Sequence, residues 1–159
     1  MLARLFHAAA AAASAVAVAA LAALAAVTVL DVAGRYLLNR PLLGAIEMSE
    51  FLMAILSFGG LAFAELRNGH ITVDFFAGAL PERARALLEA AGALLGVVFW
   101  GLVAWRATVH AVRIWEAGEV SANLMVPTWP FYLSVTVGCG LLSLALIGRV
   151  LRALRAGLA

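Results

Sequence analysis

Four long apolar stretches with short polar segments between them dominate the pattern of hydrophobic and polar positions along this chain. The first covers residues 8–30, and no charged residue lies between Arg4 and Asp31. The other three stretches cover residues 47–66, 87–105 and 129–148. A bilayer core about 30 Å thick takes roughly 20 apolar residues per helix. The pattern therefore predicts an all-α integral membrane protein with four transmembrane helices in a single membrane domain, residues 1–159.

Charged residues and prolines set the ends of two of these spans. The uncharged part of the second stretch, residues 51–64, is too short to cross a membrane alone. Its helix must therefore begin near Glu47, which places Glu50 about one turn into this helix. Pro127 and Pro130 interrupt the start of the fourth stretch, so its helix is expected to begin between them.

The first stretch has a second interpretation, as a cleaved secretory signal peptide. Arg4 precedes the stretch, and several Ala-x-Ala triplets within it could serve as cleavage sites. However, the apolar part of a signal peptide usually has about 7–15 residues. The run over residues 8–30 is much longer, which favours a transmembrane helix that is retained.

The composition agrees with a membrane protein and narrows its chemistry. Hydrophobic residues form 65% of the chain and charged residues only 13%, against roughly a quarter charged in soluble domains. The net charge of +2 is too small to indicate nucleic-acid binding. One cysteine and three scattered histidines do not suggest a metal centre, and His70 and His110 would lie about 30 Å apart across the membrane, too far to share a haem. We therefore expect no metal, no cofactor and no enzymatic activity.

The arginines predict the orientation of the spans, because cytoplasmic loops of membrane proteins carry an excess of basic residues. With four crossings, both termini lie on the same side of the membrane. If both termini lie in the cytoplasm, seven of the 11 basic residues lie on the cytoplasmic side and four lie on the outer side. The inside group is Arg4, Arg67, Arg83, Arg85, Arg149, Arg152 and Arg155, and the outside group is Arg35, Arg40, Arg106 and Arg113.

Two pairs of charged residues lie at the predicted outer ends of the first two spans. Asp31 and Arg35 are four residues apart, so they share a helix face and can form an ion pair. Glu47 and Glu50 are three apart at the start of the second helix, where acidic groups suit the positive end of the helix dipole. Alternatively, Glu50 could bind a cation or an arginine of a partner subunit.

Short helices lying along the membrane surface are expected in the connections. Residues 41–46 are too apolar for a wet loop and are expected to lie at the interface. Between the second and third spans, Val73, Phe76, Ala77 and Leu80 recur at the spacing of one helix face. This spacing predicts a short interfacial amphipathic helix over residues 73–80.

The third helix is expected to project beyond the membrane. Arg106, His110 and Arg113 recur at i, i+4 and i+7 and form a cationic stripe. The stripe could attract an acidic protein or anionic headgroups, or it could simply be a solvated face.

Two small-xxx-small pairs mark surfaces for close helix packing. Gly92 and Gly96 lie in the third span, and Ser134 and Gly138 lie in the fourth. Such pairs serve packing within a bundle or docking to another subunit.

Four short motifs lie in order along nearly the whole chain, and in combination they are fairly specific. They are R-Y-x-x-N-R-P within residues 31–41, E-x-x-x-F at 47–51, R-x-G-H-I-x-V-D at 67–74 and P-T-W-P-F-Y at 127–132. The chain thereby resembles the small membrane subunit of the TRAP transporters, the tripartite ATP-independent periplasmic transporters. It departs from the family at residues 43–45, where members often have a tryptophan, and at 121–127, where a Ser-Pro-Ala-Leu-like stretch is usual.

The resemblance implies a partnership. A four-helix subunit of this kind pairs with a large multi-span membrane subunit and a periplasmic solute-binding protein in the bacterial inner membrane. Together they import an organic acid with a sodium gradient, and the large subunit holds the substrate and sodium sites. The small subunit would support the large one and help to dock the binding protein. The alternatives are a free-standing four-span scaffold protein and a small membrane enzyme.

The resemblance also gives candidate contact residues. The candidates for contact with the large subunit are Arg35, Glu47, Glu50, Arg67, His70 and Asp74. Arg106 and Arg113 are candidates for docking the binding protein, on electrostatic grounds only. For His70 and Asp74 a local role is an open alternative, in which they fix the turn and cap the short helix.

Overall fold

The computed structural model describes residues 2–67 and 81–158. Its helices are α1 (Leu2–Leu37), α2 (Ala45–Gly59), α3 (Leu61–Leu66), α5 (Glu82–Ala117) and α6 (Trp129–Leu158). The predicted all-α membrane fold is confirmed, because the described residues hold 4 helical segments that are long and apolar enough to cross a membrane, with α2 and α3 counted as one. The four apolar stretches of the sequence lie within these segments.

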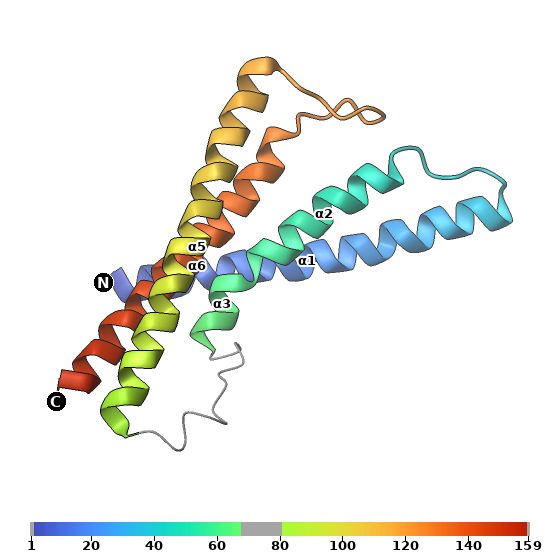
Figure 1. Ribbon diagram of the computed structural model, residues 1–159. Coiled ribbons are helices and arrows are strands. Elements are labelled where there is room, and N and C mark those ends of the chain that lie inside the picture. Colours follow the sequence, from blue (N-terminus) through green and yellow to red (C-terminus); the bar gives the residue numbers. More distant parts are fainter. Residues whose placement is uncertain (1, 68–80, 159) are drawn as a thin grey trace.

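The helices form two antiparallel hairpins that cross at an angle (Figure 1). The first hairpin is α1 with α2, and the second is α5 with α6. The loops of the two hairpins, residues 38–44 and 118–128, lie at one end of the molecule, here called the loop end. The chain termini lie towards the other end, here called the terminal end. The fold therefore has two ends with different chemistry.

The second span is broken by two glycines. α2 ends at Gly59, and α3 begins at Leu61 after Gly60, which has φ −88° and ψ −13°. Paired small residues of this kind are a common cause of helix kinks. Gly59 also lets α2 approach α1, since a Cβ at this position would lie 2.9 Å from the carbonyl oxygen of Ala13. The break redirects α3 towards the second hairpin (Figure 1).

Glycines bring the helices of the two hairpins together. A Cβ on Gly138 of α6 would overlap the carbonyl group of Phe58 in α2. A Cβ on Gly96 of α5 would lie 2.9 Å from the Cδ1 atom of Leu146 in α6. Of the predicted packing glycines, these two serve packing within the chain, whereas Gly92 has no neighbour within 4 Å of such a Cβ among the described residues.

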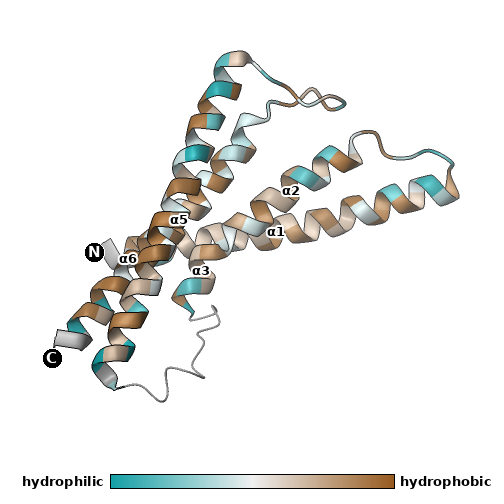
Figure 2. Ribbon diagram, viewed as in Figure 1, coloured by the Kyte–Doolittle hydropathy of each residue, from teal (hydrophilic) through white to brown (hydrophobic). Residues whose placement is uncertain are grey.

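The buried core is small, and most apolar surface faces outwards. Leu142 and Cys139 of α6 are the largest fully buried side chains in the described part of the chain. Large apolar side chains such as Val29 and Leu30 of α1 and Leu95 of α5 are exposed. Figure 2 shows hydrophobic residues along all the long helices. Such surfaces require lipid or other apolar helices as their environment.

Two loops depart from helical structure at the loop end. Residues 41–44 form a turn rather than a surface helix, and α2 begins at Ala45 after Gly44 in the left-handed conformation with φ 77°. In the second loop, Val120 and Pro127 form an isolated antiparallel bridge. The amphipathic helix expected over residues 73–80 lies outside the described residues.

Candidate functional site

Asp31 organises the tip of the first hairpin. Its Oδ2 atom pairs with the Nη2 atom of Arg35 at 2.8 Å, which confirms the ion pair expected from their spacing. Its Oδ1 atom accepts a hydrogen bond of 2.9 Å from the backbone N–H of Leu42. One carboxylate thus holds the end of α1 to the loop that leads into α2.

Glu47 joins the two hairpins at the loop end. Its Oε1 atom accepts hydrogen bonds from the backbone N–H and the side-chain amide of Asn123, both at 2.8 Å. Its Oε2 atom accepts a bond of 3.0 Å from the backbone N–H of Leu124. Hydrogen bonds to an ionised carboxylate are about twice as strong as bonds between neutral groups. We call Glu47, Asn123 and Leu124 the loop clasp.

Apolar contacts reinforce the loop clasp. The side chain of Leu124 occupies the space next to Gly44, where any side chain on that residue would collide with it. The rings of Phe51 in α2 and Phe131 in α6 stack with centroids 3.7 Å apart and an angle of 4° between their planes. The first turns of α2 and α6 are therefore held face to face.

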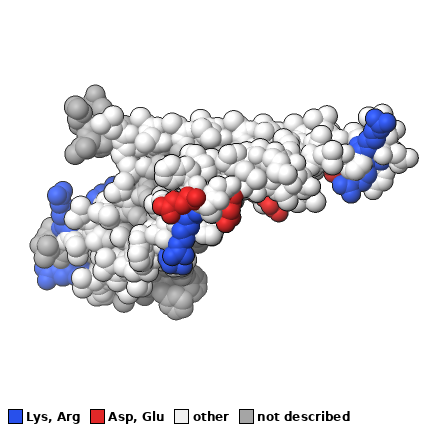
Figure 3. All heavy atoms as spheres, turned by 90° about the horizontal axis from the view of Figure 1, so that it is seen from above, with Lys and Arg blue, Asp and Glu red and all other residues white. Residues whose placement is uncertain are grey.

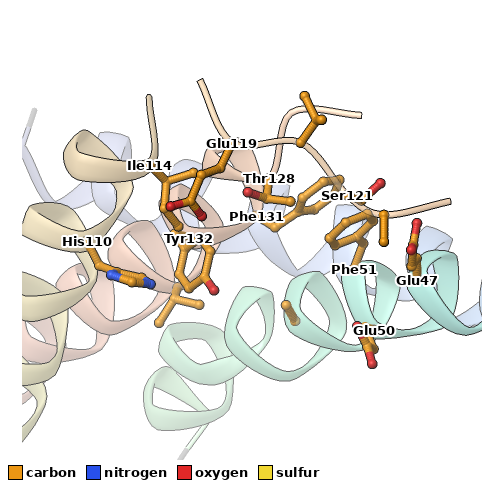
Figure 4. Close-up of a pocket in the computed structure, with 14 residues that line it drawn as sticks. Glu47, Glu50, Phe51, His110, Ile114, Glu119, Ser121, Thr128, Phe131 and Tyr132 are labelled. Carbon is orange, nitrogen blue, oxygen red and sulfur yellow. The ribbon is translucent and has the colours of Figure 1, made fainter. Parts of the chain in front are cut away.

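Beside the loop clasp, α2, α5, α6 and the second loop line an open cavity of about 450 Å³. Phe51, Ile114, Phe131 and Tyr132 give it apolar and aromatic walls (Figure 4). The ring of His110 meets the ring of Tyr132 edge-on, with centroids 4.6 Å apart. Pockets for small ligands in proteins generally have about 300–1,000 Å³ and mainly apolar walls. The size and lining of this cavity fit that class.

Three carboxylates from two elements, α2 and the second loop, lie around this cavity. They belong to Glu47, Glu50 and Glu119. Figure 4 shows Glu119 extending towards Tyr132 from the second loop, whereas the carboxylate of Glu50 points away from the cavity on the other side of α2. The carboxylate of Glu47 is engaged in the loop clasp. Within residues 2–67 and 81–158, the carboxylates of Glu50 and Glu119 make no hydrogen bond or ion pair. The cavity is therefore apolar with free negative charge at its rim.

A second polar cluster lies towards the terminal end and joins three helices. Arg149 of α6 pairs with Glu89 of α5 through an N–O distance of 2.9 Å. It also pairs with Glu65 of α3 at 3.4 Å, where the Glu65 side chain is only 5% exposed. Burial of a carboxylate is costly unless a cation or hydrogen-bond donors compensate it. Arg149 supplies that compensation, and we call these three residues the Arg149 cluster.

The other predicted residues lie on the surface. Arg35 and Glu50 are exposed at the loop end, and the guanidinium of Arg67 lies over the ring of Phe63 at 5.0 Å. Arg106 and Arg113 are exposed on α5, as the predicted cationic stripe requires. In Figure 3, acidic side chains gather over the middle of the molecule with basic side chains directly beside them, and further arginines lie towards the left and right sides of the view. His70 and Asp74 lie outside the described residues.

The sequence analysis missed the Arg149 cluster and the partners of Glu47. Glu65 and Glu89 lie near the ends of the second and third apolar stretches, and intramembrane charges generally have partners. That rule could have suggested a link to Arg149, but not which acid it would choose. In residues 2–67 and 81–158, no three His, Cys, Asp or Glu side chains are grouped to hold a metal ion.

The loop clasp gives a first testable prediction. Glu47→Ala removes three hydrogen bonds, so the second loop should open more often, and hydrogen exchange at the Asn123 and Leu124 amides should rise by about tenfold or more. Hydrogen exchange with mass spectrometry of the protein in detergent measures this. Glu50→Ala is the matched control, because Glu50 lies one turn on and does not bond the loop. Equal exchange in the two variants would contradict a clasp at Glu47.

Comparison with known proteins places this architecture in a family. The family model of the tripartite ATP-independent periplasmic transporters, DctQ component, matches residues 24–156. The sialic acid TRAP transporter small permease protein of Vibrio cholerae is 33% identical over 87 residues, which cover 55% of this chain and 50% of that protein. The ectoine TRAP transporter small permease protein of Halomonas elongata is 24% identical over 111 residues, which cover 70% of this chain and 58% of that protein.

The fold and these matches define a multi-pass protein of the bacterial inner membrane. The chain belongs to the DctQ-component family of the TRAP transporters, which confirms the resemblance found in its sequence motifs. The matched regions span about half the length of the two curated relatives. Small permease proteins of this family are transporter components.

Proposed function

We propose that this chain is the small membrane subunit of a sodium-coupled TRAP transporter that imports an organic acid from the periplasm. In this proposal it is not an enzyme. It supports a large multi-span membrane subunit and helps to dock a periplasmic solute-binding protein. The observation that carries the proposal is the family match over residues 24–156, which includes the last three apolar helical segments in whole and the C-terminal part of the first.

The surface of the described helices supports the proposed partnership. Large apolar side chains are exposed along the whole length of α1, with Val18 at 64% and Val29 at 65% exposure. Between helices in a membrane, association depends on close packing rather than on a hydrophobic driving force. A long, nearly uniform apolar helix fits both lipid and the helices of a larger subunit. The small internal core leaves most of this surface available.

The orientation with both termini in the cytoplasm remains part of the proposal, and the arginine distribution supports it. In that orientation the loop end faces the periplasm. Arg106 and Arg113 are then exposed near the outer surface, where their charge would attract an acidic face of the binding protein. The terminal end, with Arg67 and the Arg149 cluster, faces the cytoplasm.

The candidate contact residues fall into three groups. Glu47 is bound within the chain, so its contribution to a partner contact would be to hold the second loop in position. Arg35 and Glu50 are exposed and are the stronger candidates for direct contact. Arg67, His70 and Asp74 remain candidates for contact with the large subunit through their place in the family motif.

Copurification from the native membrane tests the proposed partnership. The affinity-tagged full chain, solubilised in mild detergent, should bring down a large multi-span membrane protein that mass spectrometry can identify. Arg35→Ala with Glu50→Ala should lower its yield, because charges at the membrane rim usually have partners. Arg152→Ala, an exposed arginine near the other end of the chain, is the control. A chain that purifies alone under conditions that preserve other membrane complexes would favour a free-standing scaffold protein.

A further inference from the structure

We propose that the cavity beside the loop clasp binds the headgroup of a phospholipid that carries a primary amine, such as phosphatidylethanolamine. The inference does not rest on the proposed transport function. It rests on three features of the described residues, which are the cavity, the free carboxylate of Glu119 and the arginines on the same face of α5 as His110.

The depth and shape of the cavity suit a lipid headgroup. It is built from the first turns of α2 and α6 and from the last turns of α5, at the ends of the apolar segments where headgroups lie. Its volume of about 450 Å³ equals roughly fifteen water molecules at about 30 Å³ each. Aromatic walls at this level are typical of membrane–water interfaces, and here they come from Phe51, Phe131 and Tyr132. The space is large enough for a small polar group with part of an apolar chain.

The charges around the cavity select a primary amine. Glu119 extends into the cavity region beside Tyr132, and its carboxylate has no partner in the described residues (Figure 4). Glu50 also lies at the rim, but its carboxylate points away from the cavity, so Glu119 is the acid that can receive the amine (Figure 4). An ammonium group donates hydrogen bonds to such carboxylates, and these bonds are strengthened by the opposite charges. The quaternary ammonium of choline has no N–H to donate, so it would be bound less well.

Arginines on the same helix face complement the lipid phosphate. Arg106 and Arg113 lie four residues before and three residues after His110, and His110 lines the cavity. Residues at these spacings share one face of a helix. Both arginines are exposed and have no ion pair in the described residues. The carboxylate of Glu119 at the cavity and the arginines on the same face of α5 as His110 therefore match the two opposite charges of a zwitterionic headgroup.

A basic side chain of a partner protein is the competing occupant. It would satisfy Glu119, but the same side chain would supply no negative charge for Arg106 and Arg113. A zwitterionic headgroup satisfies both signs of charge. In addition, every face of the chain that lies in a bilayer is surrounded by lipid at high concentration. The observations therefore favour the lipid.

Native mass spectrometry can test this proposal on the full chain, with any subunits that copurify. The protein is reconstituted in nanodiscs that contain equal amounts of phosphatidylethanolamine and phosphatidylcholine, released into detergent, and analysed for retained lipid. The wild-type chain should retain phosphatidylethanolamine in preference to phosphatidylcholine. Glu119→Gln should reduce this preference by about tenfold, because it weakens a charge-assisted hydrogen bond.

Two further variants keep the result interpretable. Ala54→Phe places a ring in the cavity without changing its charge, so it should also abolish the preference for the ethanolamine lipid. Glu116→Gln is the matched control, because Glu116 is an exposed acid at the same end of α5 that does not line the cavity. Far-UV circular dichroism verifies that each variant is folded.

Three results would overturn the proposal. The first is equal retention of the two lipids by the wild-type chain. The second is a preference that survives both Glu119→Gln and Ala54→Phe. The third is an unchanged lipid preference in Glu119→Gln together with a loss of copurifying large subunit, which would assign the cavity to a basic side chain of that subunit.

Discussion

Replacement of Arg149 by methionine is expected to destabilise this protein by about 3 kcal/mol, because it removes the cation between Glu65 and Glu89. Methionine keeps an apolar stem of similar length, so packing changes little while the charge is lost. The Glu65 side chain is 5% exposed and would keep its carboxylate in a poorly solvated place without this guanidinium. The expected loss lies at the lower end of the range for buried ion pairs, since 21% of the Arg149 side chain remains exposed.

Reversible unfolding in mixed micelles, followed by circular dichroism, measures this loss. Arg152→Met is the matched control, because Arg152 lies on the same helix three residues later and is exposed. The double variant Glu65→Gln with Arg149→Met should recover part of the stability, since it removes the buried carboxylate that Arg149 pairs with. If Arg149→Met loses no more stability than Arg152→Met, the Arg149 cluster does not stabilise the contact between the hairpins.

The second large effect is expected at the crossing of the two hairpins. Gly138→Ala should destabilise the protein by about 1–3 kcal/mol, because the new methyl group would overlap the carbonyl group of Phe58. The backbone of α2 cannot move away easily, since Gly59 next to it is already packed against Ala13. The two hairpins would have to separate or tilt at their closest approach.

Gly140→Ala is the control for this prediction. Gly140 lies on the same helix, and a Cβ there has no neighbour within 4 Å among the described residues. Alanine is favoured over glycine in a helix interior by up to about 1 kcal/mol, so Gly140→Ala should be neutral or stabilising. The same unfolding measurement applies to both variants. Equal stability of the two would show that the hairpins do not cross at the Gly138–Phe58 contact.

Short-range features of this fold could be predicted from the sequence, because they depend on the local pattern. The length of the apolar stretches predicted the four helical segments, and the spacing of Asp31 and Arg35 predicted their ion pair. The spacing of Arg106 and Arg113 placed them on one exposed face of α5. Each of these inferences needs only the periodicity of a single helix.

Long-range features could not be predicted, because they depend on how the hairpins are arranged in space. Glu47 and Asn123 are 76 residues apart, and no local rule links them. Gly138 was expected to pack closely, but the sequence does not identify Phe58 as its neighbour. The cavity also depends on how distant segments are arranged, since its walls come from three helices and a loop. The contacts and the cavity between the helices could therefore be identified only from the structure.

Reconstituted uptake tests the central claim, that this chain is one subunit of a TRAP transporter, most directly. Vesicles would contain this chain alone, its copurified large subunit alone, or both, with the solute-binding protein and a candidate organic acid outside and an inward sodium gradient imposed. The account predicts sodium-dependent uptake only when both membrane subunits and the binding protein are present. Substrate-dependent uptake by this chain alone, or full uptake in its absence, would contradict it.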